Sequence, residues 1–237
     1  MMLQGCAFSQ QQSQPRAELH VAAASSLTRA LPEIDAAFEK QTSIRIVPTY
    51  ASTGQLTQQM LNGSHFDILL ASDTAHVDRL IAAGACQPSS RAVYALGHIV
   101  LWVPRRPDFR SVADIVGPSA LGIIIADPTS SPYGAAAIEA MRNAGLWDKM
   151  QSKNVVYVPD AATAKDALHT DSAFTALSLI VGEPGNYFLI DDSLHQPLDH
   201  ALCITPQADA HLAATFATFL RSDAGYSILQ RYGFGRS

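Results

Sequence analysis

Residues 18–38 read ELHVAAASSLTRALPEIDAAF, and this stretch decides the fold class. Residues 19–23 form a short apolar run with the length of a buried strand. Beyond it, apolar residues recur at spacings of three and four, as on the buried face of a helix: Leu27, Ala30, Leu31, Ile34, Ala37 and Phe38. The stretch therefore predicts a strand followed by a helix, with Pro32 either kinking that helix or delaying its start.

The same order of strand and helix repeats along the rest of the chain. Further strands are expected near residues 44–50, 66–71, 93–103, 121–126, 155–158, 173–180 and 201–205. Helical patterns separate most of these strands, which predicts mainly parallel sheets covered by helices. Two segments, near residues 95–103 and 198–205, would cross between two such sheets. We therefore expect an α/β protein, a two-lobed clamshell in which each lobe is a mostly parallel sheet flanked by helices.

The clamshell pattern divides the chain into a tether and two lobes. These parts are residues 1–17 as a flexible N-terminal tether, residues 18–98 with 201–237 as lobe 1, and residues 99–200 as lobe 2. Within the tether, Leu3-Gln4-Gly5-Cys6 resembles the lipobox of bacterial lipoproteins, whose cysteine is lipidated and holds the mature domain at a membrane. The basic and apolar regions that usually precede a lipobox are missing. The motif therefore indicates either a lipid anchor at Cys6 or a chance match.

Composition excludes several classes of protein. Hydrophobic residues make up 48% of the chain and charged residues 16%, which is typical of a globular protein and not of a disordered one. The net charge is −5 and the basic residues are scattered, so neither a nucleic-acid surface nor a polybasic membrane patch is expected. Cys86 and Cys203 lie in apolar contexts, where we expect buried free thiols, although three cysteines also allow one disulfide.

The first two junctions between a strand and a helix are rich in small and hydroxylated residues. Ligands of open α/β sheets bind at the carboxyl ends of strands, where helix N-termini converge. Ser25 and Ser26 follow the first strand, and each could cap a helix or offer its hydroxyl to a ligand. Ser52 and Thr53 precede Gly54 at the second junction, where backbone N–H groups can turn toward an anion without a Cβ in the way.

Two later junctions have the same character. Ser131 fits the N-cap of a helix and Pro132 its first position, so the unpaired N–H groups of that helix begin at Tyr133. Residues 159–165 again lead from a strand into a helix with small residues. Asp127, in the third junction, is expected to point away from the cleft.

Together these junctions resemble the periplasmic molybdate-binding proteins of ABC importers. The resemblance runs from residue 19 to residue 234 and rests on an ordered set of motifs: AAASSLT at 22–28, YASTGQLTQQM at 50–60, FDILLASD at 66–73, ADPTSSPYG at 126–134, GLWD at 145–148, TALS at 175–178 and YGF at 232–234. It implies a protein with the periplasmic-binding-protein fold that works in the periplasm as a monomer. Its partners would be a small oxyanion and an ABC permease of the inner membrane. It implies no cofactor; the ligand would be molybdate or tungstate.

The resemblance also implies which residues hold the anion. Carried over position by position, the donors are Ser26 with its neighbour Ser25, Thr53 with its neighbour Ser52, and backbone N–H groups at two further positions, Tyr133 and Ala164. Molybdenum would be held through its oxygens by these residues, with no direct metal ligand. Many members have Ser where Thr53 stands, and some have a Tyr donor where this chain has the sequence ALSL at 176–179.

A cage of neutral donors favours a fully deprotonated dianion. Such a ligand offers only acceptors, whereas a protonated phosphate would also need an acceptor on the protein. Molybdate and tungstate would then be distinguished from the smaller sulfate by the size of the cavity. Another oxyanion, such as sulfate, stays an alternative at this level.

The sequence contains no recognisable set of catalytic residues. There is no G-x-S-x-G elbow, H-E-x-x-H motif, Walker loop or paired-cysteine metal motif, and eight histidines are dispersed without ligand spacing. We therefore expect a binding protein and not an enzyme. Two other interpretations stay open. One is the effector-sensing pair of lobes of a regulator, which would need a DNA-binding region. The other is an α/β hydrolase or transferase with Ser25 or Ser26 as nucleophile and a nearby base such as His20 or His98.

Overall fold

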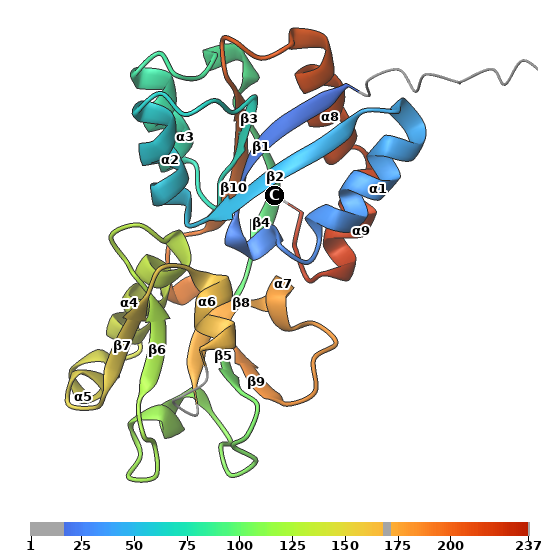
Figure 1. Cartoon of the computed structure of the whole chain (residues 1–237). Helices are drawn as coiled ribbons and strands as arrows, with labels where there is room; N and C mark the ends of the chain where they lie inside the picture. Colours follow the sequence, from blue (N-terminus) through green and yellow to red (C-terminus); the bar gives the residue numbers. More distant parts are fainter. Residues whose placement is uncertain (1–16, 168–171, 237) are drawn as a thin grey trace, which may run out of the picture.

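Two five-stranded sheets, each covered by helices, build the protein (Figure 1). The computed structural model describes residues 17–167 and 172–236. The proposed lipidation site Cys6 and the predicted tether, apart from residue 17, lie outside the described residues. Among the described residues no helix is long and apolar enough to cross a bilayer.

The first sheet has the strand order β2-β1-β3-β10-β4. Its strands are β1 (Glu18–Ala24), β2 (Arg45–Ala51), β3 (Ile68–Leu70), β4 (Ala92–Gly97) and β10 (Leu198–Ile204). Around them lie η1 (Ser25–Leu27), α1 (Leu31–Thr42), α2 (Thr53–Leu61), α3 (Ala75–Ala82), η2 (Pro88–Ser90), α8 (Ala210–Arg221) and α9 (Asp223–Arg231). β1 pairs in parallel with β2 and β3, whereas β10 is antiparallel to β3 and β4.

The second sheet has the order β7-β6-β8-β5-β9. Its strands are β5 (Ile99–Val103), β6 (Ile123–Ala126), β7 (Val155–Val158), β8 (Ala173–Ala176) and β9 (Asn186–Leu189). Its helices are η3 (Val112–Val116), α4 (Pro132–Asn143), α5 (Trp147–Gln151), α6 (Ala161–Asp166), α7 (Leu177–Ile180) and η4 (Asp192–Leu194). β6 is parallel to β7 and β8, whereas β5 is antiparallel to β8 and β9.

The antiparallel strand of each sheet is one that borders a crossing between the lobes. β4 in the first sheet and β5 in the second are separated by His98 alone, and the chain returns from β9 to β10. β5 and β10 are the first strands that the chain forms after each crossing, and each runs against the other strands of its sheet, so both sheets are mixed. The predicted two-lobed α/β class is confirmed, with one antiparallel strand in each otherwise parallel set.

Each lobe has its own apolar core. In the first, Phe38 of α1 packs against Phe216 and Phe219 of α8, with ring centroids 5.2 and 5.4 Å apart. In the second, Trp102 on β5 belongs to a buried cluster that includes Met141 on α4. Each lobe therefore has a buried apolar cluster of its own that stabilises it.

Two local predictions were wrong. The apolar run 173–180 is not one strand, because β8 ends at Ala176 and Leu177–Ile180 form the short helix α7. Short apolar runs do not distinguish a strand from a buried helical turn by periodicity. Cys86 and Cys203 are not free thiols but form a disulfide within the first lobe, across a sequence separation of 117. A pairing over that distance is set by the sheet, which places β10 next to the end of α3.

Candidate functional site

The four predicted junctions lie together where the two lobes meet (Figure 1). The N–H of Gly54 in the first lobe donates to the carbonyl oxygen of Ser130 in the second at 2.8 Å. The hydroxyl of Ser178, at the start of α7, donates to the carbonyl oxygen of Ser26 at 2.7 Å. Helices α6 and α7 both contact η1. The carboxyl ends of parallel strands in both sheets therefore face one another.

Ser26, in the first junction, is buried, and its hydroxyl makes no capping hydrogen bond to a helix. Ser25–Leu27 form a single 3₁₀ turn, and α1 begins only at Leu31, with Pro32 in its first turn. The proline therefore delays the helix and does not kink it. Ser26 is 1% exposed, and its Oγ lies 3.4 Å from Oγ of Ser72. A hydroxyl that is not needed as a cap is available to a ligand.

At the second junction, two neighbouring hydroxyl groups make different hydrogen bonds. Ser52 is the N-cap of α2: its Oγ accepts the N–H of Gln55 at 3.4 Å, and the Gln55 side chain accepts the N–H of Ser52 at 3.3 Å. Thr53 lies one residue further, and its Oγ1 accepts the N–H of Ser72 at 3.0 Å. Because that contact uses a lone pair of Thr53, the hydrogen of its hydroxyl is left to donate.

The third junction brings Tyr133 from the second lobe against the first. Ser131 and Pro132 stand at the N-cap and first turn of α4 as predicted, but the Ser131 hydroxyl makes no capping hydrogen bond. Tyr133 is 4% exposed, and its hydroxyl lies 3.2 Å from Nε2 of His200. Burial raises the pKa of Tyr133, against a smaller opposing effect of the Ser26 hydroxyl, so the phenol stays protonated at neutral pH.

Asp127, in the same junction, uses its carboxylate within its own turn. Its Oδ1 accepts the N–H of Thr129 at 2.9 Å and the hydroxyl of Thr129 at 2.8 Å. The charge is therefore held on the exposed side of the turn and serves to shape the loop that enters α4.

The fourth junction contributes the start of α6. Asp160 is the N-cap, and its Oδ1 accepts the N–H of Thr163 at 2.9 Å. Ala164 is fully buried beside Ile124, but its N–H donates to the carbonyl oxygen of Asp160 at 3.0 Å. That N–H already closes the first turn of the helix.

Sequence reasoning did not assign two residues that the structure places among these junctions. Ser72, which follows β3, bridges Ser26 and Thr53, and Ser178, which follows β8, holds the Ser26 carbonyl. Both are buried, with 2% and 3% exposure. Each follows the carboxyl end of a parallel strand, and applying the junction rule to every strand would have found them.

The arrangement is one of neutral donors and not of catalytic groups. His98, one predicted base, lies with its Nδ1 3.1 Å from Oδ1 of Asp192, and His20, the other, is exposed near the start of β1. Within residues 17–167 and 172–236, no group of three or more His, Cys, Asp or Glu side chains could hold a metal ion. Hydroxyl and N–H groups around one point suit a ligand that only accepts hydrogen bonds.

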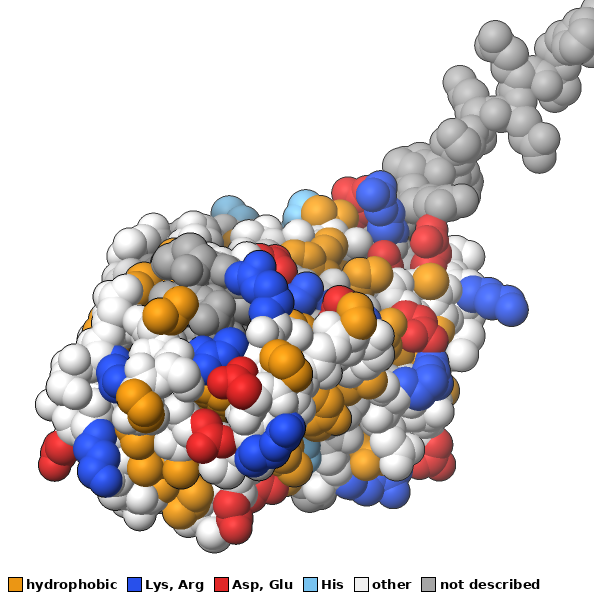
Figure 2. Space-filling view, turned by 90° about the horizontal axis from the view of Figure 1, so that it is seen from below, with side chains coloured by type: hydrophobic (Ala, Val, Ile, Leu, Met, Phe, Trp, Pro, Cys, Tyr) orange, Lys and Arg blue, Asp and Glu red, His pale blue; other side chains and the backbone are white. Residues whose placement is uncertain are grey.

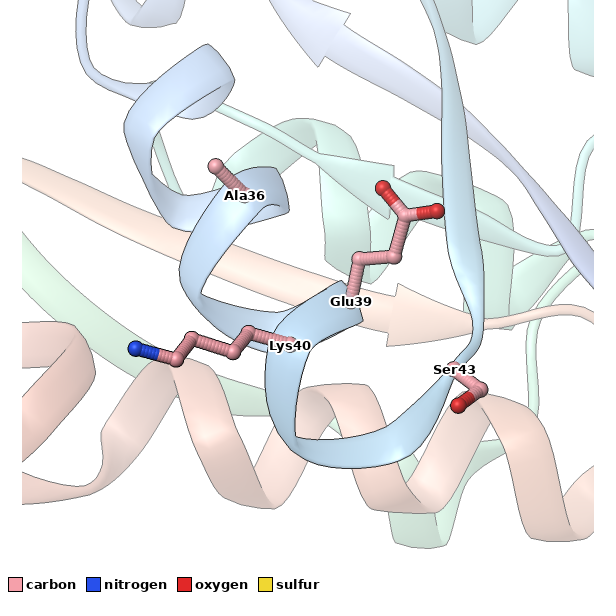
Figure 3. A pocket seen from close by; sticks show the side chains of 4 residues that line it. All are labelled: Ala36, Glu39, Lys40 and Ser43. Atoms are coloured by element: carbon pink, nitrogen blue, oxygen red, sulfur yellow. The ribbon is translucent and has the colours of Figure 1, made fainter.

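Other surface features are remote from the junctions. A depression of about 400 Å³ is lined by Ala36, Glu39, Lys40 and Ser43 on the outer side of α1 (Figure 3). It belongs to one lobe and carries both charge signs, so it lacks the character of an anion site. On the face shown in Figure 2, acidic and basic side chains are interspersed, without a single-sign patch.

Comparisons with known proteins agree with this geometry. A family model described as bacterial extracellular solute-binding protein matches residues 19–235. Similar relatives are the molybdate-binding protein ModA of Rhodobacter capsulatus, 29% identical over 92% of this chain and 88% of that protein, and ModA of Azotobacter vinelandii, 28% identical over 92% and 90%. The solved periplasmic molybdate-binding protein of Azotobacter vinelandii superposes with a TM-score of 0.88 at 24% identity, covering 92% of this chain and 99% of that one.

Proposed function

Because the chain belongs to the family of bacterial extracellular solute-binding proteins, we propose that it captures a tetrahedral oxyanion, molybdate or tungstate, between its lobes and delivers it to an ABC permease. The observation that carries the proposal is the convergence of buried hydroxyls from Ser26, Ser72 and Thr53 with the start of α4 across the lobe boundary. The names and functions of the two ModA relatives support the choice of ligand. As a member of a solute-binding family, the protein is a carrier and not an enzyme.

The chemistry of the proposed site suits a dianion. Ser26 and Thr53 would donate through their hydroxyls, with Ser25 and Ser52 as neighbours that shape the turns. The second lobe would add backbone N–H groups from the first turn of α4 at Tyr133 and from the first turn of α6. The N–H of Ala164 is shared with Asp160, so the amides just before it are the better placed donors of that turn. Helix N-termini attract negative charge even though the whole protein carries −5.

Closure would complete the site. Arg29 of the first lobe donates to the carbonyl oxygens of Leu179 and Val181 in the second, at 3.0 and 2.8 Å, and Gly54 reaches Ser130 across the same boundary. These contacts belong to the closed arrangement. A ligand that touches both lobes binds this arrangement better than an open one and shifts the population toward it. The permease would recognise the closed shape, and the carrier would act as a monomer.

Localisation follows from the family at a coarse level. An extracellular solute-binding protein works outside the cytoplasm, in the periplasm. We further propose that Cys6 carries a lipid anchor, an idea supported by a putative ABC transporter substrate-binding lipoprotein of Bacillus subtilis, 26% identical over 99% of this chain. Expression with a labelled fatty acid tests it: Cys6→Ser should abolish labelling and release the protein from membranes. Equal labelling of the two forms would refute the anchor.

Calorimetric titration of the ligand-free protein tests the proposed ligand. Molybdate and tungstate should bind at one site each, and sulfate and phosphate at least about 100-fold more weakly, a difference of roughly 2.7 kcal/mol. Tight sulfate binding with weak molybdate binding would replace the proposed ligand by the alternative oxyanion. Absence of binding by all four anions would refute the oxyanion proposal.

A further inference from the structure

The short helix α7 of the second lobe is hydrogen-bonded to the first lobe at both of its ends. At its beginning, the Ser178 hydroxyl donates to the carbonyl oxygen of Ser26 at 2.7 Å. At its end, Nη1 of Arg29 donates to the carbonyl oxygens of Leu179 and Val181, at 3.0 and 2.8 Å. The 3₁₀ turn η1 also contacts α7 directly (Figure 1). We call these three hydrogen bonds the α7 clasp.

The carbonyl groups at the end of α7 are divided between the two lobes. Those of Leu177 and Ile180 accept N–H groups of the second lobe itself. Those of Leu179 and Val181 accept from Arg29. The last carbonyl groups of a helix have no partner within the helix and carry partial negative charge, so a guanidinium suits them as a donor. When the lobes separate, both carbonyl groups lose this donor.

Groups from both lobes surround the Arg29 side chain. Oε1 of Glu183, in the second lobe, lies 3.7 Å from Nη1 of Arg29, and the ring centroid of Tyr232, in the first lobe, lies 5.8 Å from its Cζ. The Arg29 and Glu183 side chains are 33% and 34% exposed, so water screens their ion pair and its contribution is small. Hydrogen bonds from a charged donor to the two carbonyl groups are stronger. The α7 clasp therefore depends on the donors of Arg29 more than on its charge.

The α7 clasp and the candidate site share one turn of the first lobe. The N–H and the hydroxyl of Thr28 both donate to the carbonyl oxygen of Ser25, at 3.2 and 3.0 Å, which fixes the turn that carries Ser26 and Arg29. The proposed anion donor and the clasp therefore move as one unit. Every hydrogen bond of the clasp joins two protein groups, so it stabilises the closed form without using a donor that the anion needs.

We propose that Arg29 is a positioning residue that holds α7 against the first lobe and sets how slowly the captured anion leaves. The inference rests on the proposed function for its ligand and adds the protein contact that governs release. An anion enclosed by both lobes leaves only after they open, so a contact made in the closed form alone slows dissociation. The anion first meets the open form, in which the clasp is not made, so association is unaffected.

Release of radiolabelled molybdate into an excess of unlabelled molybdate measures the dissociation rate, and calorimetry gives the affinity, from which the association rate follows. Arg29→Met keeps the apolar part of the side chain but has no donor. It should raise the dissociation rate about tenfold and leave the association rate within about twofold of wild type. Arg29→Lys, which restores a charged donor, should recover most of the slow release.

The matched control is Arg91→Met. It removes a guanidinium that pairs with Asp78 inside the first lobe, so the change in net charge is the same and both rates should stay unchanged. Slower association with unchanged dissociation in Arg29→Met would show that Arg29 attracts the anion by its charge, and would overturn the proposal. Two unchanged rates in Arg29→Met would overturn it as well.

A second variant covers the case in which Arg29→Met folds poorly, which urea denaturation would reveal. Ser178→Ala removes the hydrogen bond at the other end of α7 and should raise the dissociation rate about threefold or more, again without slowing association. Wild-type release from Ser178→Ala would then refute the α7 clasp.

Hydrogen–deuterium exchange of the anion-free protein tests the clasp independently of the ligand. Residues 177–183 should exchange faster in Arg29→Met than in the wild type, because hydrogen bonds that hold a segment protect its amides. Equal exchange would refute the clasp and leave the oxyanion carrier intact. If the wild-type protein bound none of the four anions, the proposed function would fail, and exchange would still decide whether Arg29 holds α7.

Discussion

At the scale of single residues, Ser52 and Thr53 show how neighbouring hydroxyls divide two tasks. The Ser52 hydroxyl caps α2, whereas the Thr53 hydroxyl accepts the N–H of Ser72 and keeps its own hydrogen for donation. Thr53→Val should therefore weaken molybdate binding about 10- to 100-fold, since a hydrogen bond to a charged ligand contributes roughly 1.5–3 kcal/mol. Titration calorimetry measures the loss, and Thr53→Ser, which keeps the hydroxyl, should bind like the wild type.

Ser52→Ala is the complementary change at this scale. Loss of the cap should lower the free energy of unfolding by about 1 kcal/mol, with an affinity for molybdate within about threefold of wild type. Urea denaturation and calorimetry together separate the two effects. An affinity loss from Ser52→Ala as large as that from Thr53→Val would contradict this division of tasks between the two hydroxyls.

At the scale of secondary-structure elements, the start of α2 meets the loop that precedes α4 without room for a side chain. A Cβ on Gly54 would lie 2.7 Å from the carbonyl oxygen and 2.8 Å from Cα of Ser130. Gly54→Ala should hinder closure of the lobes while each lobe stays folded. We expect at least about tenfold weaker molybdate binding and a smaller decrease in radius of gyration on adding molybdate, measured by solution scattering. Wild-type closure in this variant would show that the contact is dispensable.

The disulfide acts at the same scale, within one lobe. Cys86, in the turn after α3, and Cys203 on β10 link segments that are distant in sequence. Cys203→Ser should lower the free energy of unfolding by about 2–4 kcal/mol, chiefly by freeing the unfolded chain. Chemical denaturation with and without a reducing agent measures this, and the reductant should affect the wild type alone. Because neither cysteine takes part in the hydrogen bonds that hold Ser26, Ser72 and Thr53, molybdate affinity should be retained.

At the scale of the whole molecule, His200 makes stability depend on pH. Its pKa in the folded protein, about 3, lies below the ordinary value of 6.5, and Tyr94, Tyr133 and the Asp73 carboxylate are the titratable groups that face it. The unfolded chain therefore binds a proton between these values that the folded protein does not. Stability from this residue is present above about pH 6.5 and falls as the pH decreases toward 3, with a slope of up to about 1.4 kcal/mol per pH unit.

Urea denaturation at pH 7, 6 and 5 checks this dependence. His200→Gln keeps a polar side chain but has no proton to gain, so its stability should change less over the same interval. Parallel decreases for the wild type and His200→Gln would place the pH dependence elsewhere, for example in the carboxylates whose pKa is lowered by hydrogen bonds, such as Asp108 and Asp191.

Much of the fold and part of the site were predictable from local sequence. Alternating apolar runs and helical spacings predicted the β-α order, since both periodicities follow from backbone geometry. The Ser131-Pro132 pair predicted the start of α4, because proline suits the first turn of a helix. These features involve residues within one turn or one strand of each other, so the chain specifies them before it folds.

Tertiary structure alone decided the rest. The pairing of Cys86 with Cys203, the bridge of Ser72 between Ser26 and Thr53, and the placement of His200 against Tyr133 all join residues that are far apart in sequence. Which hydroxyl serves as a cap and which keeps its hydrogen depends on the partner that the other strand or lobe supplies. Hydrogen-bond donors and acceptors are saturated by neighbours in space, and no local pattern records those neighbours.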